Sequence, residues 1–423
     1  MPTHDVLIVG AGLAGLCCAR ELNRHGVTFK VVEGSDGIGG RVRTDEVDGF
    51  LLDRGFQVLL TAYPEAQRVL DYDALDLRSF YDGALVRFDG GFHRVADPLR
   101  EPLAAPQTAF SPIGTLADKL RVLKLRQGVR SPSLDALWAR PEVSTRAALT
   151  ERYGFSDVML QRFFQPFLGG ILLDRDLGTS SRAFEFYFRM FTEGETAVPA
   201  RGMQQIPEQL AAALPDHAIQ LNTRVQHAEP YSITLEHGGT VEARAVVVAT
   251  DGPEVAYLLD SFDPPASRSV LCLYYAALDA PHTEPVLVLD GDGDGPVNNL
   301  TVMSTVSPYY APTGQSLVSV SVVGNPSQPD AEVETRVRAH LRRWYGDAVD
   351  AWRHLKTYRI LHAQPAQPPT ALTPPERPAR LADGLYVAGD HRTNASINGA
   401  MVSGRRAAEA VLADLGIPLV AQP

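Results

Sequence analysis

Cysteine is scarce in this chain, and the cysteines that it has form no ligand pattern. There are three, Cys17, Cys18 and Cys272, and two of them are adjacent. A disulfide framework and a structural zinc site both need cysteine or histidine ligands at short, regular spacing. We therefore expect neither, and we predict small apolar packing residues in a reducing compartment and no bound metal.

Lysine is also rare, and the overall charge is negative. Only four of the 39 basic residues are lysines, and the formal net charge of the 423 residues is −11. A protein that binds nucleic acid without sequence preference needs a basic face. The acidic balance argues against nucleic acid as a partner.

Long hydrophobic runs are missing as well. The N-terminal run from Val6 to Val9 is too short for a signal peptide, and no basic segment precedes it. No stretch reaches the roughly 20 apolar residues of a membrane-spanning helix. The sequence therefore predicts a cytoplasmic protein, and its length predicts two domains rather than one core.

What the chain does have is a glycine-rich turn within its first 15 residues. The apolar run is followed by Gly10-Ala11-Gly12-Leu13-Ala14-Gly15 and then by a helical pattern. A strand, such a turn and a helix bind a pyrophosphate: Gly10 permits the turn, Gly12 allows close approach and Gly15 lets the helix pack on the strand. A tight turn without a ligand is the alternative interpretation.

An acidic residue follows at the distance that a dinucleotide site requires. Glu33 ends the next apolar run, and a carboxylate about 20 residues after the glycine turn can accept hydrogen bonds from a ribose diol. The loop after it contains Gly34 and then Gly39-Gly40-Arg41. Adjacent glycines bring backbone close to a ligand, and Arg41 can supply charge to a pyrophosphate. These residues predict that the turn holds a dinucleotide.

This order of motifs resembles the FAD-binding superfamily that includes flavin amine oxidases, protoporphyrinogen oxidases and phytoene desaturases. The resemblance runs from the glycine turn through residues 49–57 and returns at the C-terminus, so it covers the whole chain. It implies noncovalent FAD as the cofactor. It also implies cofactor contacts for Gly55, Phe56 and Gln57 near the flavin ring, for Val225 near the adenine, and for Ala249 at the end of a buried strand.

A last strand and turn near the C-terminus fit the same resemblance. The apolar run of residues 384–388 leads into Gly389 and Asp390, and ligands bind at the carboxyl ends of strands in open α/β sheets. Asp390 would accept a hydrogen bond from a ribityl hydroxyl. The final helix opens at Ser396-Ile397 and includes Ala400, and its dipole would stabilise negative charge on the reduced flavin.

The expected fold is α/β, with a Rossmann-like FAD-binding domain of the GR2 type that is discontinuous in sequence. We predict this domain at residues 1–57, 198–255 and 380–423. An α+β substrate-binding or cap domain is predicted at residues 58–197 and 256–379.

A phenylalanine-rich segment, residues 159–173, allows two interpretations. It contains Phe163, Phe164 and Phe167 and is broken by Pro166. We interpret it first as core of the cap. The alternative is an apolar tunnel wall, or a patch that touches a membrane surface so that a lipid-like substrate can enter, since several members of the superfamily are peripheral membrane proteins.

An acidic repeat, Asp290-Gly291-Asp292-Gly293-Asp294-Gly295, looks like the start of a calcium loop because carboxylates at positions 1, 3 and 5 precede a glycine. Position 12 is Thr301 rather than glutamate, and no helices are expected on either side. We therefore interpret the repeat as a hairpin turn.

The type of reaction depends on residues of the predicted substrate domain. The stretch 269–278, where amine oxidases commonly carry a lysine, has none, although Lys356 on a later strand could substitute. Our main prediction is therefore hydride transfer from a small apolar substrate to FAD, as in desaturases, with oxygen, a quinone or another acceptor. A flavin amine oxidase is the alternative, followed by a flavin-dependent isomerase and a non-enzymatic prenyl-binding protein of the same fold.

No catalytic base can be assigned from the sequence, and neither can the oligomeric state. Aromatic residues of the predicted substrate domain are expected to line the pocket: Phe164, Phe167, Tyr274, Tyr309 and Tyr310. Amine oxidases commonly carry an aromatic cage beside the flavin. Tyr274 and Tyr275 are neighbours on a strand and must face opposite sides, so they cannot both line one wall of such a cage.

Overall fold

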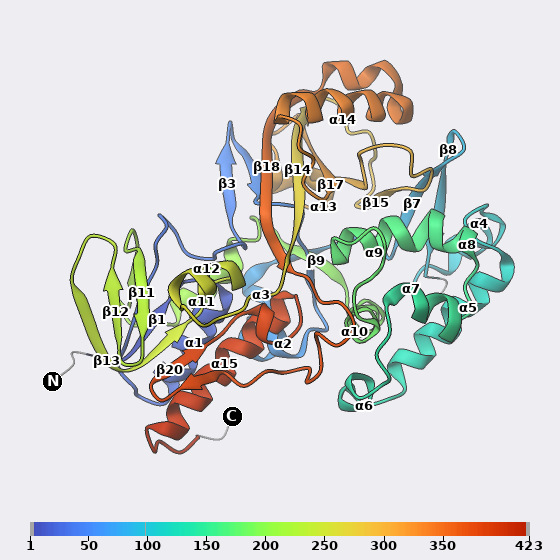
Figure 1. The fold of residues 1–423 in the computed structure, drawn as a ribbon. Helices are drawn as coiled ribbons and strands as arrows, with labels where there is room; N and C mark the ends of the chain where they lie inside the picture. The colour runs from blue at the N-terminus through green and yellow to red at the C-terminus, as the bar shows by residue number, and fades with distance from the viewer. Residues whose placement is uncertain (1–3, 98, 420–423) are drawn as a thin grey trace.

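The computed structural model describes residues 4–97 and 99–419. It is a mixed α/β fold with two large sheets (Figure 1). In the first sheet the parallel strands follow the order β10-β2-β1-β13, and β20 pairs with the second half of β13. The strands are β1 (His4–Val9), β2 (Phe29–Val32), β10 (Ile219–Gln220), β11 (Val225–Glu229), β12 (Ser232–Leu235), β13 (Thr240–Val248), β19 (Arg380–Ala382) and β20 (Leu385–Val387).

The first sheet is buried on both faces at its centre, as the unbroken apolar run of β1 predicts. Val6 and Ile8 pack in one apolar cluster, whereas Leu7 and Val9 pack in another, because successive side chains of a strand alternate. Helices α1 (Leu13–Arg24) and α15 (Ile397–Asp414) cover one face, and α12 (Gly252–Leu258) covers the other. The two ends of the chain therefore meet in one layer.

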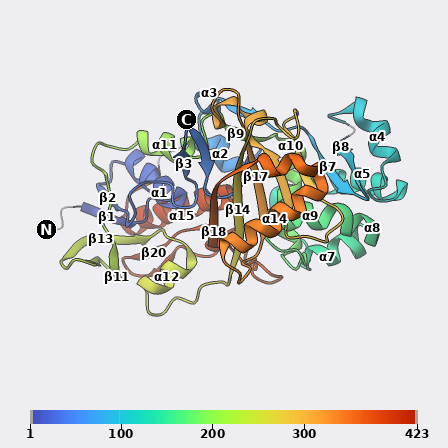
Figure 2. The same ribbon diagram turned by 90° about the horizontal axis from the view of Figure 1, so that it is seen from above.

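The second sheet has seven strands and stands beside the first (Figure 1). Helix α14 (Asp330–Tyr345) crosses one of its faces, which Figure 2 shows from above. Tyr274 faces the other side and Tyr275 faces α14, so the opposite orientation expected for these neighbours is confirmed. The order is β18 (Arg353–Pro365), β14 (Ser267–Ala277), β17 (Ser316–Val323), β16 (Asn299–Val302), β15 (Leu287–Asp290), β7 (Gly83–Phe88) and β8 (Gly91–Ala96).

A helical region packs against the face of the second sheet opposite α14, at the end of the molecule remote from α1 (Figures 1 and 2). The helices are α4 (Ala105–Phe110), α5 (Leu116–Arg130), α6 (Leu134–Trp138), α7 (Thr145–Ala147), α8 (Asp157–Met159), α9 (Gln165–Leu172) and α10 (Ser181–Glu193).

Smaller elements connect the two layers. The ribbon β3 (Thr44–Val47) and β4 (Phe50–Asp53) projects beside β18 (Figure 1). Three short strands form a separate sheet in the order β5-β9-β6. The remaining elements are β5 (Leu59–Leu60), β6 (Leu77–Ser79), β9 (Thr196–Pro199), α2 (Pro64–Val69), α3 (Tyr72–Leu75), α11 (Gln205–Ala212) and α13 (Met303–Val306).

Two local details differ from or add to the sequence interpretation. Residues 219–229 form two strands, β10 and β11, because Asn222 between them takes a left-handed conformation with φ of 52°. The acidic repeat joins the antiparallel strands β15 and β16, so the hairpin interpretation is confirmed. Among residues 4–97 and 99–419, no helix is both long and apolar enough to cross a membrane.

Candidate active site

The glycine turn after β1 leaves room for a ligand at one glycine only. A Cβ on Gly15 would lie 1.9 Å from the carbonyl oxygen of Gly10, so Gly15 is needed for packing of α1 on the turn. Gly10 has a φ of 103°, which a side chain would strain. At Gly12 a Cβ would meet nothing within 4 Å. Gly12 therefore faces open space, as the pyrophosphate role requires.

Glu33 lies beside this turn because β2 pairs with β1. One carboxylate oxygen accepts a hydrogen bond from the Ala11 N–H at 2.8 Å, and the other accepts from the Ser35 N–H at 2.8 Å. The carboxylate is thus fixed in orientation while still lining the cavity described below. Its remaining lone pairs are free to accept from ribose hydroxyls.

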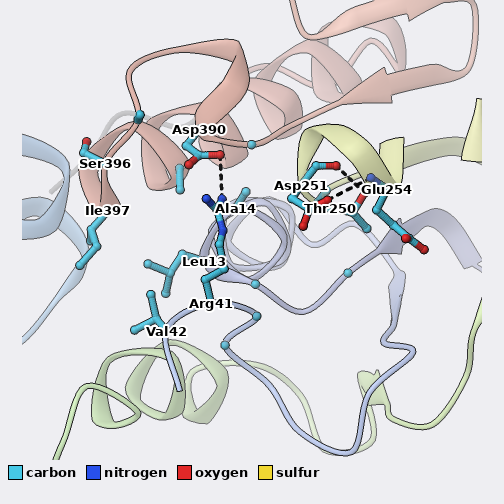
Figure 3. A pocket seen from close by; sticks show the side chains of 18 of the residues that line it. Leu13, Ala14, Arg41, Val42, Thr250, Asp251, Glu254, Asp390, Ser396 and Ile397 are labelled. Atoms are coloured by element: carbon cyan, nitrogen blue, oxygen red, sulfur yellow. Dashed lines mark hydrogen bonds and ion pairs between the residues drawn. The ribbon is translucent and has the colours of Figure 1, made fainter. Parts of the chain in front are cut away.

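Arg41 and Asp390, 349 positions apart, meet across the cavity. A guanidinium nitrogen of Arg41 lies 2.8 Å from a carboxylate oxygen of Asp390, and a second nitrogen donates to the Ala363 carbonyl oxygen at 2.8 Å. Figure 3 shows this pair between Ser396 and Ile397 on one side and Asp251 on the other. The pair therefore joins the two halves of the cleft.

The cleft itself is a cavity of about 440 Å³. It brings together most of the predicted cofactor residues: Gly10, Gly12, Leu13, Ala14, Glu33, Gly39, Gly40, Arg41, Ala249, Gly389, Asp390, Ser396, Ile397 and Ala400. It also contains residues that the motifs did not indicate: Val42, Thr250, Asp251, Glu254 and Ala395. Thr250 and Asp251 follow β13 directly, so their place at a strand's carboxyl end was the signal that could have found them.

Three predicted cofactor residues line neither this cavity nor the two that are described below. Gly15 packs against the turn, and Gly34 lies against Arg224. Val225 is buried on β11 among the apolar residues of the first sheet. Their predicted contact with the cofactor stays a prediction, and for Gly15 the structure shows a packing role.

The N-terminus of α15 forms the other end of the cleft. Ser396 caps the helix by accepting a hydrogen bond from the Gly399 N–H at 2.9 Å. A Cβ on Gly399 would lie 1.9 Å from the Asn394 carbonyl oxygen, so only glycine allows this tight start. The positive end of the helix dipole thus points toward the cavity wall formed by Ser396 and Ile397.

A second cavity, of about 240 Å³, continues from the first. The two share Arg41, Ala395, Ser396 and Ile397 in their walls. The residues predicted near the flavin ring, Gly55, Phe56 and Gln57, line this second cavity. The Gln57 side-chain nitrogen donates to the carbonyl oxygens of Arg41, at 2.8 Å, and Arg54, at 3.1 Å, which fixes the amide at the junction.

A third cavity, of about 220 Å³, extends the second into the helical region. Both are lined by Phe56, Val58, Phe167, Ile171, Phe191 and Leu287. Phe164, which was predicted for the substrate pocket, lines the third cavity, and Phe167 lines both. The phenylalanine-rich segment is therefore part core and part cavity wall, and it is not a surface patch.

The three tyrosines predicted for the substrate pocket line none of these cavities. The Tyr310 hydroxyl donates to the buried carboxylate of Asp53 at 2.7 Å, and the Tyr274 hydroxyl donates to the Asp53 carbonyl oxygen at 2.8 Å. Tyr309 is 43% exposed and stacks with Arg201. The pocket role predicted for these tyrosines is therefore not supported by their positions. A buried tyrosine needs a hydrogen-bond partner, and Asp53 supplies it to Tyr274 and Tyr310.

Two other tyrosines, which the sequence did not single out, line the second cavity. Tyr187 donates to the Ala395 carbonyl oxygen at 3.0 Å, and Tyr63 lies next to it. Burial raises the pKa of both hydroxyls above the usual range, so both stay neutral. Within residues 4–97 and 99–419, no lysine lines any of the three cavities. Lys356 instead forms an ion pair with Asp45 at 3.1 Å.

The family model for flavin-containing amine oxidoreductases matches residues 13–412. The chain belongs to this family. FAD is therefore its cofactor, and the chain is an oxidase-family enzyme. The cleft fits that cofactor, because Gly12 faces open space, Glu33 offers carboxylate lone pairs and the α15 dipole points into the wall.

Similar proteins act on different substrates. Putrescine oxidase from Kocuria rosea is 27% identical over 296 residues, or 63% of this chain and 60% of that protein, so the match spans less than two thirds of the relative. A putative protoporphyrinogen oxidase from Exiguobacterium sp. has a similar structure, with a TM-score of 0.72 and 18% identity over 98% of this chain and 100% of that one. Cyclohexylamine oxidase from Brevibacterium oxydans has a TM-score of 0.71 and 17% identity over 98% and 100%.

Proposed function

We propose that the chain is an FAD-dependent oxidase of a small apolar monoamine. The family and the named amine oxidases favour amine oxidation over the desaturation that the sequence first suggested. The single observation that carries the substrate class is the continuous apolar passage formed by the second and third cavities. This passage adjoins the cofactor cleft through Ser396 and Ile397.

The apolar walls select the form of the amine that can react. A hydride leaves the α-carbon of an amine only when the nitrogen has an unshared pair, so the free base is the reactive form. Removing an ammonium ion from water into a cavity lined by Phe56, Phe167 and Ile171 is costly. The cavity therefore lowers the pKa of a bound amine and favours its neutral form.

Among the residues that the structure describes, the passage offers no free carboxylate for a second positive charge. The acidic residues of the third cavity are Asp82 and Asp97, and both are paired with arginine: Asp82 with Arg100 at 2.9 Å, and Asp97 with Arg126. A diamine such as putrescine would bring an uncompensated ammonium group into this space. We therefore propose a monoamine with an apolar body rather than a diamine.

The cofactor cleft would hold FAD, which would supply a two-electron acceptor for a hydride from the substrate carbon, and an acceptor such as oxygen would take the electrons onward. The residues of the chain supply the surroundings for this step. Phe56, Phe167 and Ile171 exclude water, Gln57 fixes the junction of the cavities, and the neutral Tyr63 and Tyr187 line the wall as hydrogen-bond donors or acceptors. The second cavity thus orients the substrate, and no lysine side chain of the described residues takes part in the step.

Anaerobic bleaching of the flavin tests this proposal. We expect a panel of apolar monoamines, cyclohexylamine among them, to reduce the flavin of the purified holoenzyme at least about tenfold faster than putrescine, because each uncompensated charge costs more than a kcal/mol in the cavity. The absorbance near the flavin maximum reports the reaction directly. Bleaching by putrescine alone would contradict the assignment.

A second candidate, oxidation of an apolar molecule that is not an amine, is favoured by the absence of lysine from the cavities. Such chemistry needs little acid–base machinery. It also fits the similarity in fold to a putative protoporphyrinogen oxidase. Reduction of the flavin by a porphyrinogen or a polyene, with no response to any amine of the panel, would select this candidate.

We further propose that the enzyme contacts an anionic membrane surface through α4, α5 and the segment before them. Large apolar side chains are strongly exposed there: Leu99, Leu103, Phe110, Leu116 and Leu120 are 67%, 94%, 89%, 67% and 63% exposed. Leu123, also exposed, lines the third cavity. The patch therefore borders the passage proposed for the substrate.

The charge of α5 supports this surface. The helix carries five basic residues and one acid in a chain whose net charge is −11, and it contains two of the four lysines: Lys119, Arg121, Lys124, Arg126 and Arg130 are the basic residues, and Asp118 is the acid. Asp118 is buried and bonded to Thr115, Ser156 and Arg121, so it does not face the surface. Exposed leucines among basic residues are typical of helices that lie on anionic lipid.

Sedimentation with vesicles tests the contact. We expect the protein to bind vesicles that contain phosphatidylglycerol and to bind pure phosphatidylcholine weakly, because part of the attraction is electrostatic. The double variant Leu116→Asp, Leu120→Asp should bind at least about tenfold less. Leu278→Asp, at an exposed site elsewhere, is the matched control. Equal sedimentation of all three proteins would rule the contact out.

A further inference from the structure

The acidic hairpin turn between β15 and β16 lies against a histidine of α14. Asp290 ends β15, Asp294 belongs to the turn, and His340 comes from the middle of α14. One ligand atom of each lies within 4.8 Å of the others. None of the three residues lines the three cavities described above, so this cluster is separate from the proposed active site.

Asp290 is buried without compensation. The residue is 2% exposed, and neither oxygen of its carboxylate has a hydrogen-bond partner. Arg87 is its neighbour on β7, but the Arg87 guanidinium donates to the carbonyl oxygens of Gly91 and Arg343 instead. A buried carboxylate with no partner is costly, and a bound cation is one of the few ways to offset that cost.

His340 presents a second unsatisfied atom to the same place. Its side chain is 1% exposed, and Nε2 has no hydrogen-bond partner and lies 3.9 Å from an oxygen of Asp294. A neutral imidazole nitrogen is a common ligand for a transition-metal ion. A Cβ on Gly295 would lie 2.1 Å from the ring, so the glycine of the repeat is what allows the turn to approach the histidine.

We propose that Asp290, Asp294 and His340 bind one divalent transition-metal ion, with Zn²⁺ as the best-matched probe. Two carboxylates and one imidazole suit Zn²⁺, whereas a calcium loop would need oxygen ligands throughout. The turn holds Asp290 and Asp294, and the helix supplies His340. Such an ion would tie the β15–β16 hairpin to α14.

Metal binding has a consequence for the backbone of the turn. The Val297 N–H donates to Nδ1 of His340 at 3.3 Å, which places the ring proton on Nε2. Coordination through Nε2 moves that proton to Nδ1, so the Val297 N–H must give up this long hydrogen bond. The amide of Val297 therefore reports on occupancy of the site.

Arg343 is not one of the three proposed ligands, but it partly neutralises the charge of the site. Its guanidinium pairs with both oxygens of Asp294, at 2.6 and 3.0 Å, and both side chains are about half exposed. The pair leaves Asp294 partly neutralised in the absence of metal. Removing the arginine while keeping all three ligands should therefore strengthen metal binding.

Equilibrium dialysis of the chelator-treated holoenzyme against Zn²⁺, with metal content measured on the protein, tests the proposal. We expect one Zn²⁺ per chain, at least tenfold weaker binding in Asp290→Asn and in His340→Gln, and tighter binding in Arg343→Gln. His354→Gln, a histidine outside the cluster, is the matched control. In the unchanged protein, Zn²⁺ should also shift the Val297 amide resonance and raise Tm, which keeps the test valid if a variant does not fold.

Three results would overturn the proposal. The first is no Zn²⁺ bound to the unchanged protein. The second is Zn²⁺ whose affinity is the same in His340→Gln as in the control. The third is Ca²⁺ bound more tightly than Zn²⁺ by a site that keeps its affinity in His340→Gln, which would indicate an oxygen-only loop. The experiment measures neither flavin content nor amine oxidation. A negative result for Zn²⁺ binding therefore does not bear on the proposed function.

Discussion

The Glu33→Ala variant is expected to be purified with about tenfold less flavin than the unchanged protein, or with none. The carboxylate faces the cofactor cleft and is fixed there by the N–H groups of Ala11 and Ser35. Hydrogen bonds to a charged group contribute about 1.5–3 kcal/mol each, which is a factor of ten or more in affinity. Absorbance of the purified protein, relative to its protein content, measures the loss.

Two controls separate this result from a folding defect. Glu46→Ala removes an exposed carboxylate on β3 and should leave the flavin content unchanged. Glu33→Gln keeps a side-chain oxygen and should lose less flavin than Glu33→Ala. An undiminished flavin content in Glu33→Ala would contradict the ribose role assigned to this residue.

The Ile171→Asp variant is expected to lose about 100-fold or more in kcat/KM for the best monoamine while keeping its flavin. Ile171 lies in the wall shared by the second and third cavities but not in the cofactor cleft. An uncompensated charge in an apolar space costs several kcal/mol, so the substrate's apolar body would no longer fit there. Steady-state kinetics together with the flavin absorbance measure both parts of this expectation.

The conservative variant Ile171→Leu should retain most of the activity, since it keeps the volume and the apolar character of the wall. Leu361→Asp adds the same charge at a position that is 48% exposed and should have no effect. If Ile171→Asp turned over the monoamine as fast as Ile171→Leu, the second and third cavities would not be the route or the binding place of the substrate.

The cofactor half of the enzyme could be predicted from the sequence because its signals are local. The glycine turn, Glu33 and Asp390 each follow an apolar strand directly, and a parallel sheet brings the carboxyl ends of its strands to one edge. Fourteen predicted residues accordingly meet in one cavity.

The substrate half could not be predicted in the same way. Tyr274 and Tyr310 carry the right chemistry for a pocket, but their partner, Asp53, lies more than 200 positions away in sequence. Which of several buried aromatic residues faces a cavity depends on long-range packing rather than on local pattern. Tyr63 and Tyr187 were missed for the same reason, and so was the approach of His340 to Asp290.

The pairing of β1, β13 and β20 has a consequence for the order in which the protein acquires its parts during synthesis. The cofactor cleft is closed by residues from opposite ends of the chain, as the contact of Arg41 with Asp390 shows. Contacts of such large sequence separation form late, after the intervening region has folded. The ribosome must therefore release almost the entire chain before a nascent molecule can bind its flavin. Until β20 pairs with β13, that edge of β13 stays open to pairing with other chains.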